Sequence, residues 1–191
     1  MGESGKVLVL LGGESTGKSW LAQAMCQALQ AEGLDVVAVS EHLRQFCETH
    51  GRTPRADEQR GIAEAQTLAI AQAARKHAIV IADTSALMTA VYSARLFADS
   101  SLYPHAIAKQ RSYAATLLTA LDLPWVADGL QRDGPTSRQR IDNDLRDVMV
   151  GHGLPFSVIH GKGPARLAAA LAAIRPALQK PPEDETGERR R

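Results

Sequence analysis

The chain has 191 residues, of which 45% are hydrophobic and 23% are charged, and its formal net charge is +1. This length suits one domain with a sizeable core. The near-neutral charge gives no general attraction to nucleic acid or to an acidic membrane surface, and no apolar run approaches the ~20 residues that span a bilayer. With two cysteines and no visible signal peptide, we expect a cytoplasmic protein with reduced thiols.

Residues 7–11 are five consecutive apolar residues, which predicts a strand buried on both faces of a parallel sheet. Residues 12–19 follow directly and match G-x-x-x-x-G-K-[ST], the phosphate-binding loop. Apolar residues then recur at helical spacing, at Leu21, Met25 and Leu29. The order strand, loop, helix is the context that this motif requires. We therefore expect the protein to bind a nucleoside triphosphate, and a chance match in a glycine-rich turn is the alternative.

The residue types of this loop indicate its chemistry. Gly12 and Gly17 allow backbone conformations that a Cβ would forbid, so the loop amides can form a concave nest for phosphate oxygens. The following helix adds the positive end of its dipole. We expect Lys18 to reach the β- and γ-phosphates of ATP and the Ser19 hydroxyl to bind Mg²⁺. The predicted nucleotide-binding residues here are Gly12, Gly13, Glu14, Ser15, Thr16, Gly17, Lys18, Ser19 and Trp20.

Residues 36–39 predict a second strand, which runs into a helical segment over about 40–46. A carboxylate at the carboxyl end of a strand lies at the ligand crevice of an open α/β sheet. Glu41 is therefore a candidate catalytic base or acceptor of a substrate hydroxyl. The alternative is a first-turn glutamate favoured by the helix dipole. Arg44, one turn further on, is a candidate partner for Glu41 or for a phosphate.

A predicted helix over about 56–77 carries Gln66 near its apolar face. Residues 78–82 then predict a third strand that ends at Asp83. An apolar strand closing on aspartate beside a phosphate-binding loop is the Walker B arrangement, in which the aspartate holds Mg²⁺ directly or through water. Asp83 is thus a candidate metal ligand with Ser19, and a helix-capping role is the alternative.

The fourth strand is predicted at residues 113–118, after a helix over 86–97 that carries Tyr92. Beyond it we predict a lid over about 131–150, with its helix capped by Thr136 or Ser137. In small P-loop kinases the arginines of such a lid close over the phosphates. The candidates are Arg132, Arg138 and Arg140, of which Arg132 and Arg138 are the predicted catalytic ones, and a solvated arginine-rich helix start is the alternative.

The fifth strand is predicted at residues 155–159, and the loop after it commonly contacts adenine in this architecture, which adds Gly161 to the nucleotide-binding set. Residues 180–191 have no apolar side chains to bury and predict a disordered tail. Residues 1–179 thus predict one α/β domain of the P-loop NTPase fold. Its five-stranded parallel sheet has the order 2-3-1-4-5, with helices on both faces.

Several motifs together resemble the nicotinamide riboside kinase domain of NadR-type proteins, within a wider group of small P-loop ATPases and kinases. The resemblance covers residues 6 to about 178. It implies ATP- and Mg²⁺-dependent phosphorylation of the 5′-hydroxyl of nicotinamide riboside to nicotinamide mononucleotide, a step of NAD biosynthesis. The motifs are the loop at 12–19, Glu41-x-x-Arg44-x-Phe46, Gln66, Asp83-Thr84 and Trp125-Val126-x-Asp128-Gly129-Leu130.

The resemblance also implies a substrate site. The catalytic base that deprotonates the acceptor hydroxyl is either Glu41 or Asp83. Three departures from the family pattern bear on it. Ser85 replaces an aspartate, Gln131 replaces an arginine, and Ser40 and Ala71 stand at places of the aromatic residues that sandwich the nicotinamide ring. Tyr92 or Trp125 is a candidate replacement for stacking. The implied substrate-binding residues are Glu41, Arg44, Gln66, Tyr92, Trp125 and Asp128.

Two other functions stay open on the sequence alone. One is a kinase for another nucleoside, and the other is an ATPase that acts as a nucleotide-dependent switch. A pocket opposite the phosphates would distinguish a kinase from a switch. We expect a small-molecule nucleoside as the binding partner, and we expect no association with a membrane. A nucleic-acid role would need a basic stripe, which only Arg189-Arg190-Arg191 suggests.

Overall fold

The computed structural model describes residues 4–126 and 134–179. Its centre is a sheet of five parallel strands in the order β2-β3-β1-β4-β5, which confirms the predicted topology. The central strand, β1, lies between β3 and β4, so its apolar residues are covered from every side. The strands are β1 (Lys6–Leu11), β2 (Val36–Val39), β3 (Ile79–Asp83), β4 (Ala115–Thr119) and β5 (Ser157–Ile159).

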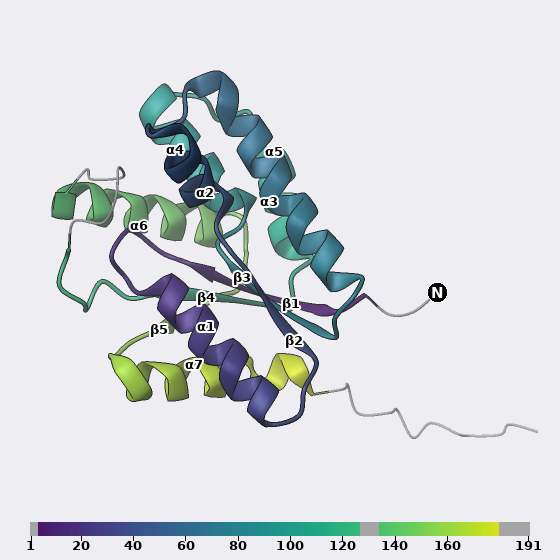
Figure 1. Cartoon of the computed structure of the whole chain (residues 1–191). Helices are drawn as coiled ribbons and strands as arrows, with labels where there is room; N and C mark the ends of the chain where they lie inside the picture. The colour runs from purple at the N-terminus through teal and green to yellow at the C-terminus, as the bar shows by residue number, and fades with distance from the viewer. Residues whose placement is uncertain (1–3, 127–133, 180–191) are drawn as a thin grey trace, which may run out of the picture.

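Helices cover both faces of the sheet, as predicted (Figure 1). One face carries α1 (Lys18–Ala31) and α7 (Gly163–Leu178). A short 3₁₀ turn, η1 (Ala56–Glu58), leads into α3. The opposite face carries α2 (His42–His50), α3 (Gln59–Ala74), α4 (Ala86–Phe97), α5 (Tyr103–Arg111) and α6 (Gly134–Gly151).

Each face has its own apolar core because successive side chains of a strand point to opposite faces. Val7, Val9 and Leu11 pack with the α2–α6 side, whereas Leu8 and Leu10 pack with α1 and α7. A strand buried on both faces must be apolar at every position, and this continuous run is the pattern that identified β1 in the sequence.

The bounds of several elements differ from the prediction. The helix expected over 56–77 is η1 followed by α3, which ends at Ala74, and the fourth strand reaches Thr119. The cap predicted at Thr136 or Ser137 is wrong, because α6 begins at Gly134. Pro135 fits the first helical turn, where its missing amide hydrogen and fixed φ cost nothing. The predicted tail, and residues 131–133 of the predicted lid, lie outside the described residues.

Cys26 and Cys47 are both buried, one in each of the two cores. Burial raises the pKa of the Cys26 thiol. Within residues 4–126 and 134–179, no helix combines the length and the apolar character needed to cross a membrane.

A buried glutamine, Gln110, links α4, α5 and β4. The Ser85 hydroxyl donates to its Oε1 at 2.7 Å, and its Nε2 donates to Thr116 Oγ1 at 2.7 Å. We expect Gln110→Leu to lower the free energy of unfolding by about 1–3 kcal/mol, because two buried hydroxyls lose their partner. Urea unfolding followed by circular dichroism measures this, and an unchanged midpoint would contradict it.

Candidate functional site

The phosphate-binding loop leaves β1 and enters α1 through two glycines in the left-handed region. Gly12 has φ +144°, and a Cβ there would lie 2.2 Å from Thr119 Oγ1. Gly17, with φ +77°, precedes the first residue of α1, Lys18. Gly12 is thus required both by its backbone angle and by the close approach of β4, which explains the first glycine of the motif.

The Lys18 ammonium lies across this loop. Its Nζ donates to the carbonyl oxygens of Gly12 at 2.8 Å and Gly13 at 2.9 Å. The Thr16 hydroxyl also donates to the Gly13 carbonyl, at 2.8 Å. The Thr119 hydroxyl lies 2.7 Å from Thr16 Oγ1 and 3.1 Å from the Leu11 carbonyl oxygen. The loop therefore has internal bonds that keep it curved.

An open cleft of about 570 Å³ lies over the loop. It is lined by residues 14–20, by the segment that joins β2 to α2, by α4, and by the segment after β4. Trp20 is 50% exposed at its wall. Nine side chains predicted to bind nucleotide or substrate, or to act in catalysis, line this cleft: Glu14, Ser15, Thr16, Lys18, Ser19, Trp20, Glu41, Arg44 and Tyr92.

Glu41 is the residue immediately before α2, and it is 8% exposed. Its side chain makes no capping bond to α2. Burial raises the pKa of its carboxyl; nearby Lys18 opposes this shift, Asp83 adds to it, and Arg44 opposes it. A carboxyl with a raised pKa beside a phosphate-binding lysine is suited to take a proton from a hydroxyl.

Asp83 ends β3 and is 5% exposed, and its Oδ1 has no hydrogen-bond partner among the described residues. It lines a hollow of about 220 Å³ together with Ser19 and Glu41. No group of three or more histidine, cysteine, aspartate or glutamate side chains in the described ranges forms a metal cage. An unpartnered carboxylate oxygen beside a serine hydroxyl fits Mg²⁺, which usually takes few protein ligands and completes its shell with phosphate and water.

Gln66, which is 2% exposed, bonds to the backbone of the residue that follows each of these two carboxylates. Its Oε1 accepts from the His42 amide at 2.8 Å, and its Nε2 donates to the Thr84 carbonyl at 3.4 Å. Thr84 follows Asp83 with φ +72°, an uncommon conformation for a β-branched residue. Gln66 does not line the cleft, so it supports Glu41 and Asp83 from behind through these backbone bonds.

A second hollow, of about 530 Å³, adjoins the cleft, and Glu14 and Tyr92 line both. Its other walls come from α2, the segment 53–55, η1, the first residue of α3, and α4. Arg52 precedes the segment 53–55 in the chain, and its guanidinium donates two bonds of 2.7 Å to Glu58 and lowers the pKa of that carboxyl to about 2. The residues that sequence reasoning missed, Gln59, Leu96 and Phe97, lie here.

Arg138 of the predicted lid is 8% exposed and is tied to backbone. Its two terminal nitrogens each lie 3.0 Å from the Leu123 carbonyl, and Nη1 lies 3.4 Å from the Ser15 carbonyl. It thus joins α6 to the phosphate-binding loop. Trp125 is half-buried and lines neither cavity. Asp128 and Arg132 lie outside the described residues.

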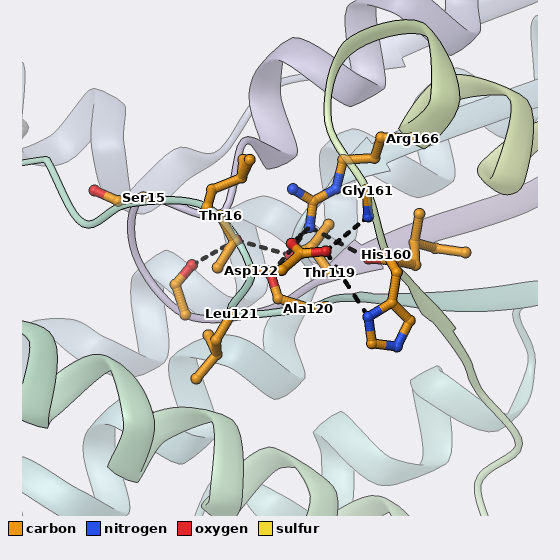
Figure 2. A network of polar contacts seen from close by, with 12 residues as sticks. Ser15, Thr16, Thr119, Ala120, Leu121, Asp122, His160, Gly161 and Arg166 are labelled. Atoms are coloured by element: carbon orange, nitrogen blue, oxygen red, sulfur yellow. Dashed lines mark hydrogen bonds and ion pairs between the residues drawn. The ribbon is translucent and has the colours of Figure 1, made fainter.

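The β5–α7 loop is tied to the end of β4 through Asp122 (Figure 2). The Gly161 amide donates to Asp122 at 2.7 Å, and the Arg166 guanidinium lies 3.2 Å from the same carboxylate. Arg166 is 1% exposed and also donates to the carbonyls of Ala120 and Ile159. Burial lowers the pKa of Arg166, and Asp122 opposes that shift. The loop that carries Gly161 is thereby fixed relative to β4.

The structure shows where three residues that depart from the family pattern lie, namely Ser85, Ser40 and Ala71. Ser85 is buried and caps α4, where its Oγ accepts from the Leu87 amide at 3.3 Å. Ser40 lines the small hollow with Asp83. The placement of Ala71 in a ring-binding site is wrong: it lines a hollow with Gly5 at the opposite edge of the sheet, because α3 carries it away from the carboxyl ends of the strands.

The sequence matches the model of the AAA_28 family, described as an AAA domain, over residues 7–166. The chain belongs to this family. No protein of curated function matches the sequence.

Solved structures similar to this AAA domain include two of the NadR protein, one in complex with NR and one with NAD and AMP-PNP. Their TM-scores are 0.73 and 0.71, at 19% and 20% identity. Both matches cover 91% of this chain, which spans about half the length of those structures. Thymidylate kinase from Ehrlichia chaffeensis matches with TM-score 0.65 and 15% identity, over 90% of this chain and 98% of that one. These similarities establish a shared fold, as the sequence resemblance predicted.

We expect Asp122→Asn to lower the free energy of unfolding of this AAA domain by about 1–2 kcal/mol, because the buried Arg166 loses its counter-charge. The loss is smaller than for a fully buried pair, since Asp122 is 34% exposed. Glu32→Gln is the control: it removes the exposed Arg175 pair and should cost less than about 0.5 kcal/mol. Equal losses in the two variants, measured by urea unfolding, would contradict this account.

Proposed function

We propose that this AAA domain is an ATP-dependent small-molecule kinase, with nicotinamide riboside as the first candidate acceptor. The observation that carries the proposal is the pair of adjoining cavities: the cleft over the phosphate-binding loop and the second hollow, with Glu14 and Tyr92 common to both. Phosphoryl transfer requires a donor and an acceptor side by side. A nucleotide-dependent switch needs only the first cavity.

In this proposal the cleft holds ATP. The loop amides and the N-terminus of α1 receive the phosphates, and the Lys18 ammonium exchanges the carbonyls of Gly12 and Gly13 for phosphate oxygens. Ser19 and Asp83 hold Mg²⁺, which would neutralise charge on the phosphates when bound. The unpartnered Oδ1 of Asp83 supports a ligand role for this residue rather than that of the base.

Glu41 is then the group that positions and deprotonates the acceptor hydroxyl. It is buried, it lines the cleft, and its raised pKa makes it a stronger base than an ordinary glutamate. Arg138 stays a candidate for contact with the phosphates, through the Ser15 segment that it touches. Most of the rate gain in such a site comes from positioning and preorganised charge.

The acceptor ring occupies the second hollow. Tyr92 stands where the two cavities meet, and Phe97 provides an aromatic wall further in. These two residues take the place of the aromatic pair that the sequence does not supply at Ser40 and Ala71. The NadR structure in complex with NR, which shares this fold, supports nicotinamide riboside as the first acceptor to test.

We expect Glu41→Gln to lower kcat by about 10²–10⁴-fold and to leave the dissociation constant for ATP within about threefold. Rapid-quench turnover and calorimetric titration measure the two quantities. An unchanged kcat would refute the catalytic role of Glu41.

The same substitution should raise stability at high pH. The pKa of Glu41 lies above its ordinary 4.5 in the folded state, so the folded state binds more protons between the two values. Stability therefore falls as pH rises through that window, and glutamine removes the cost of the buried charge. Urea midpoints of the wild type and Glu41→Gln should diverge as pH rises from 5 to 9. Midpoints that stay parallel would contradict the raised pKa.

The direct test of the proposal is the mass of the product formed from nicotinamide riboside and Mg-ATP. A product heavier by one phosphate, formed by the wild type and lost in Lys18→Met, supports the kinase and its donor site. Turnover that survives Lys18→Met would show that the activity does not use this cleft.

A further inference from the structure

Gln59, the first residue of α3, is an exception among the buried glutamines of the described chain. It is 2% exposed, yet its Oε1 has no hydrogen-bond partner there. In contrast, Gln66 Oε1 accepts from the His42 amide, and Gln110 Oε1 accepts from the Ser85 hydroxyl. Buried carbonyl groups are nearly always hydrogen-bonded, so an unpartnered one requires a reason.

The place of Gln59 supplies that reason, because its side chain lines the second hollow. Much of the remaining wall is apolar, from Leu43, Pro54 and Phe97. Arg55 also lines the hollow but is exposed to solvent. The surroundings of Gln59 therefore suit a flat ring whose edge meets the neutral amide of Gln59 at the wall, where its Oε1 lies buried.

We propose that Gln59 selects an acceptor whose ring carries an amide N–H, as a carboxamide or a lactam does, over the corresponding carboxylate. The inference rests on the proposed kinase function. An N–H of the ring donates to Gln59 Oε1 and satisfies it. A carboxylate has no proton to donate to this oxygen, and its charge would meet apolar side chains and the Glu14 carboxyl in the hollow, where the lining cation, Arg55, is exposed to solvent. Gln59 is thus the specificity residue of the acceptor site.

The test compares kcat/KM for nicotinamide riboside and for the riboside in which a carboxylate replaces the carboxamide. The wild type should prefer the amide by at least about tenfold. Gln59→Leu should bring the ratio to within about threefold, through a higher KM for the amide at nearly unchanged kcat. Gln110→Leu is the matched control, since it removes a buried glutamine outside the hollow, and it should keep the wild-type ratio.

Stability without ligand separates a binding role from a structural one. Gln59→Leu should leave the melting temperature equal or higher, because leucine replaces an amide whose carbonyl has no partner, whereas Gln110→Leu should lower it. A Gln59→Leu variant that melts as low as Gln110→Leu and keeps the amide preference would overturn the proposal.

Failure of this inference can be told apart from failure of the kinase proposal. Equal kcat/KM for both ribosides in the wild type leaves the kinase standing and overturns the role of Gln59. If another nucleoside alone is phosphorylated, that nucleoside and its N-methylated form become the matched pair, with the same loss of preference expected in Gln59→Leu. Phosphorylation of no nucleoside overturns the kinase, and the role of Gln59 with it.

Discussion

The close approach of β4 to the phosphate-binding loop is the constraint on which the rest of the site depends. The missing Cβ of Gly12 leaves room for the Thr119 hydroxyl, which joins Leu11 at the end of β1 to Thr16 in the loop. Any side chain at residue 12 would push β4 away and open the loop. The three central strands, β3, β1 and β4, therefore bring their carboxyl ends to one small region, and the cleft forms where the loop curves over them.

The charges at this edge help to keep the loop curved. Lys18 donates to two backbone carbonyls of the loop, so the proposed phosphate binding would exchange one set of oxygen partners for another. Glu41 and Asp83 both lie buried, and the charge of Asp83 adds to the burial that raises the pKa of Glu41. Asp83 has an unpartnered Oδ1 and Glu41 has a raised pKa, which is the reason to propose metal binding for the first and proton transfer for the second.

The parts of the fold that were predictable from sequence are those set by local pattern. The apolar run of β1, the loop at 12–19 and the strand ending at Asp83 each carry their signal within a few residues, and parallel topology then follows from crossover rules. The second hollow had no such signal. Its walls come from α2, α3, α4 and the segment 53–55, so Gln59 acquires its neighbours only through tertiary packing.

The tertiary contacts of individual side chains could not be predicted from the sequence either. Arg138 was predicted as a lid arginine from its place in a basic segment, but its burial against the Leu123 carbonyl depends on how α6 packs through Leu145 and Met149. Ala71 was assigned to the ring site by alignment of a pattern, and the direction of α3 places it at the far edge of the sheet. Spacing along a chain identifies a helix face, but it does not say which end of the helix faces the site.

In the proposed kinase, the cleft and the second hollow act together as donor and acceptor sites. The most direct measurement is the rate of ADP release from Mg-ATP with and without each member of a nucleoside panel. The account predicts stimulation of at least about tenfold over basal hydrolysis by one nucleoside or a small set, with nicotinamide riboside first, because positioned transfer far exceeds transfer to water. Equal ADP release with every nucleoside and with none would contradict it, and would favour a nucleotide-dependent switch.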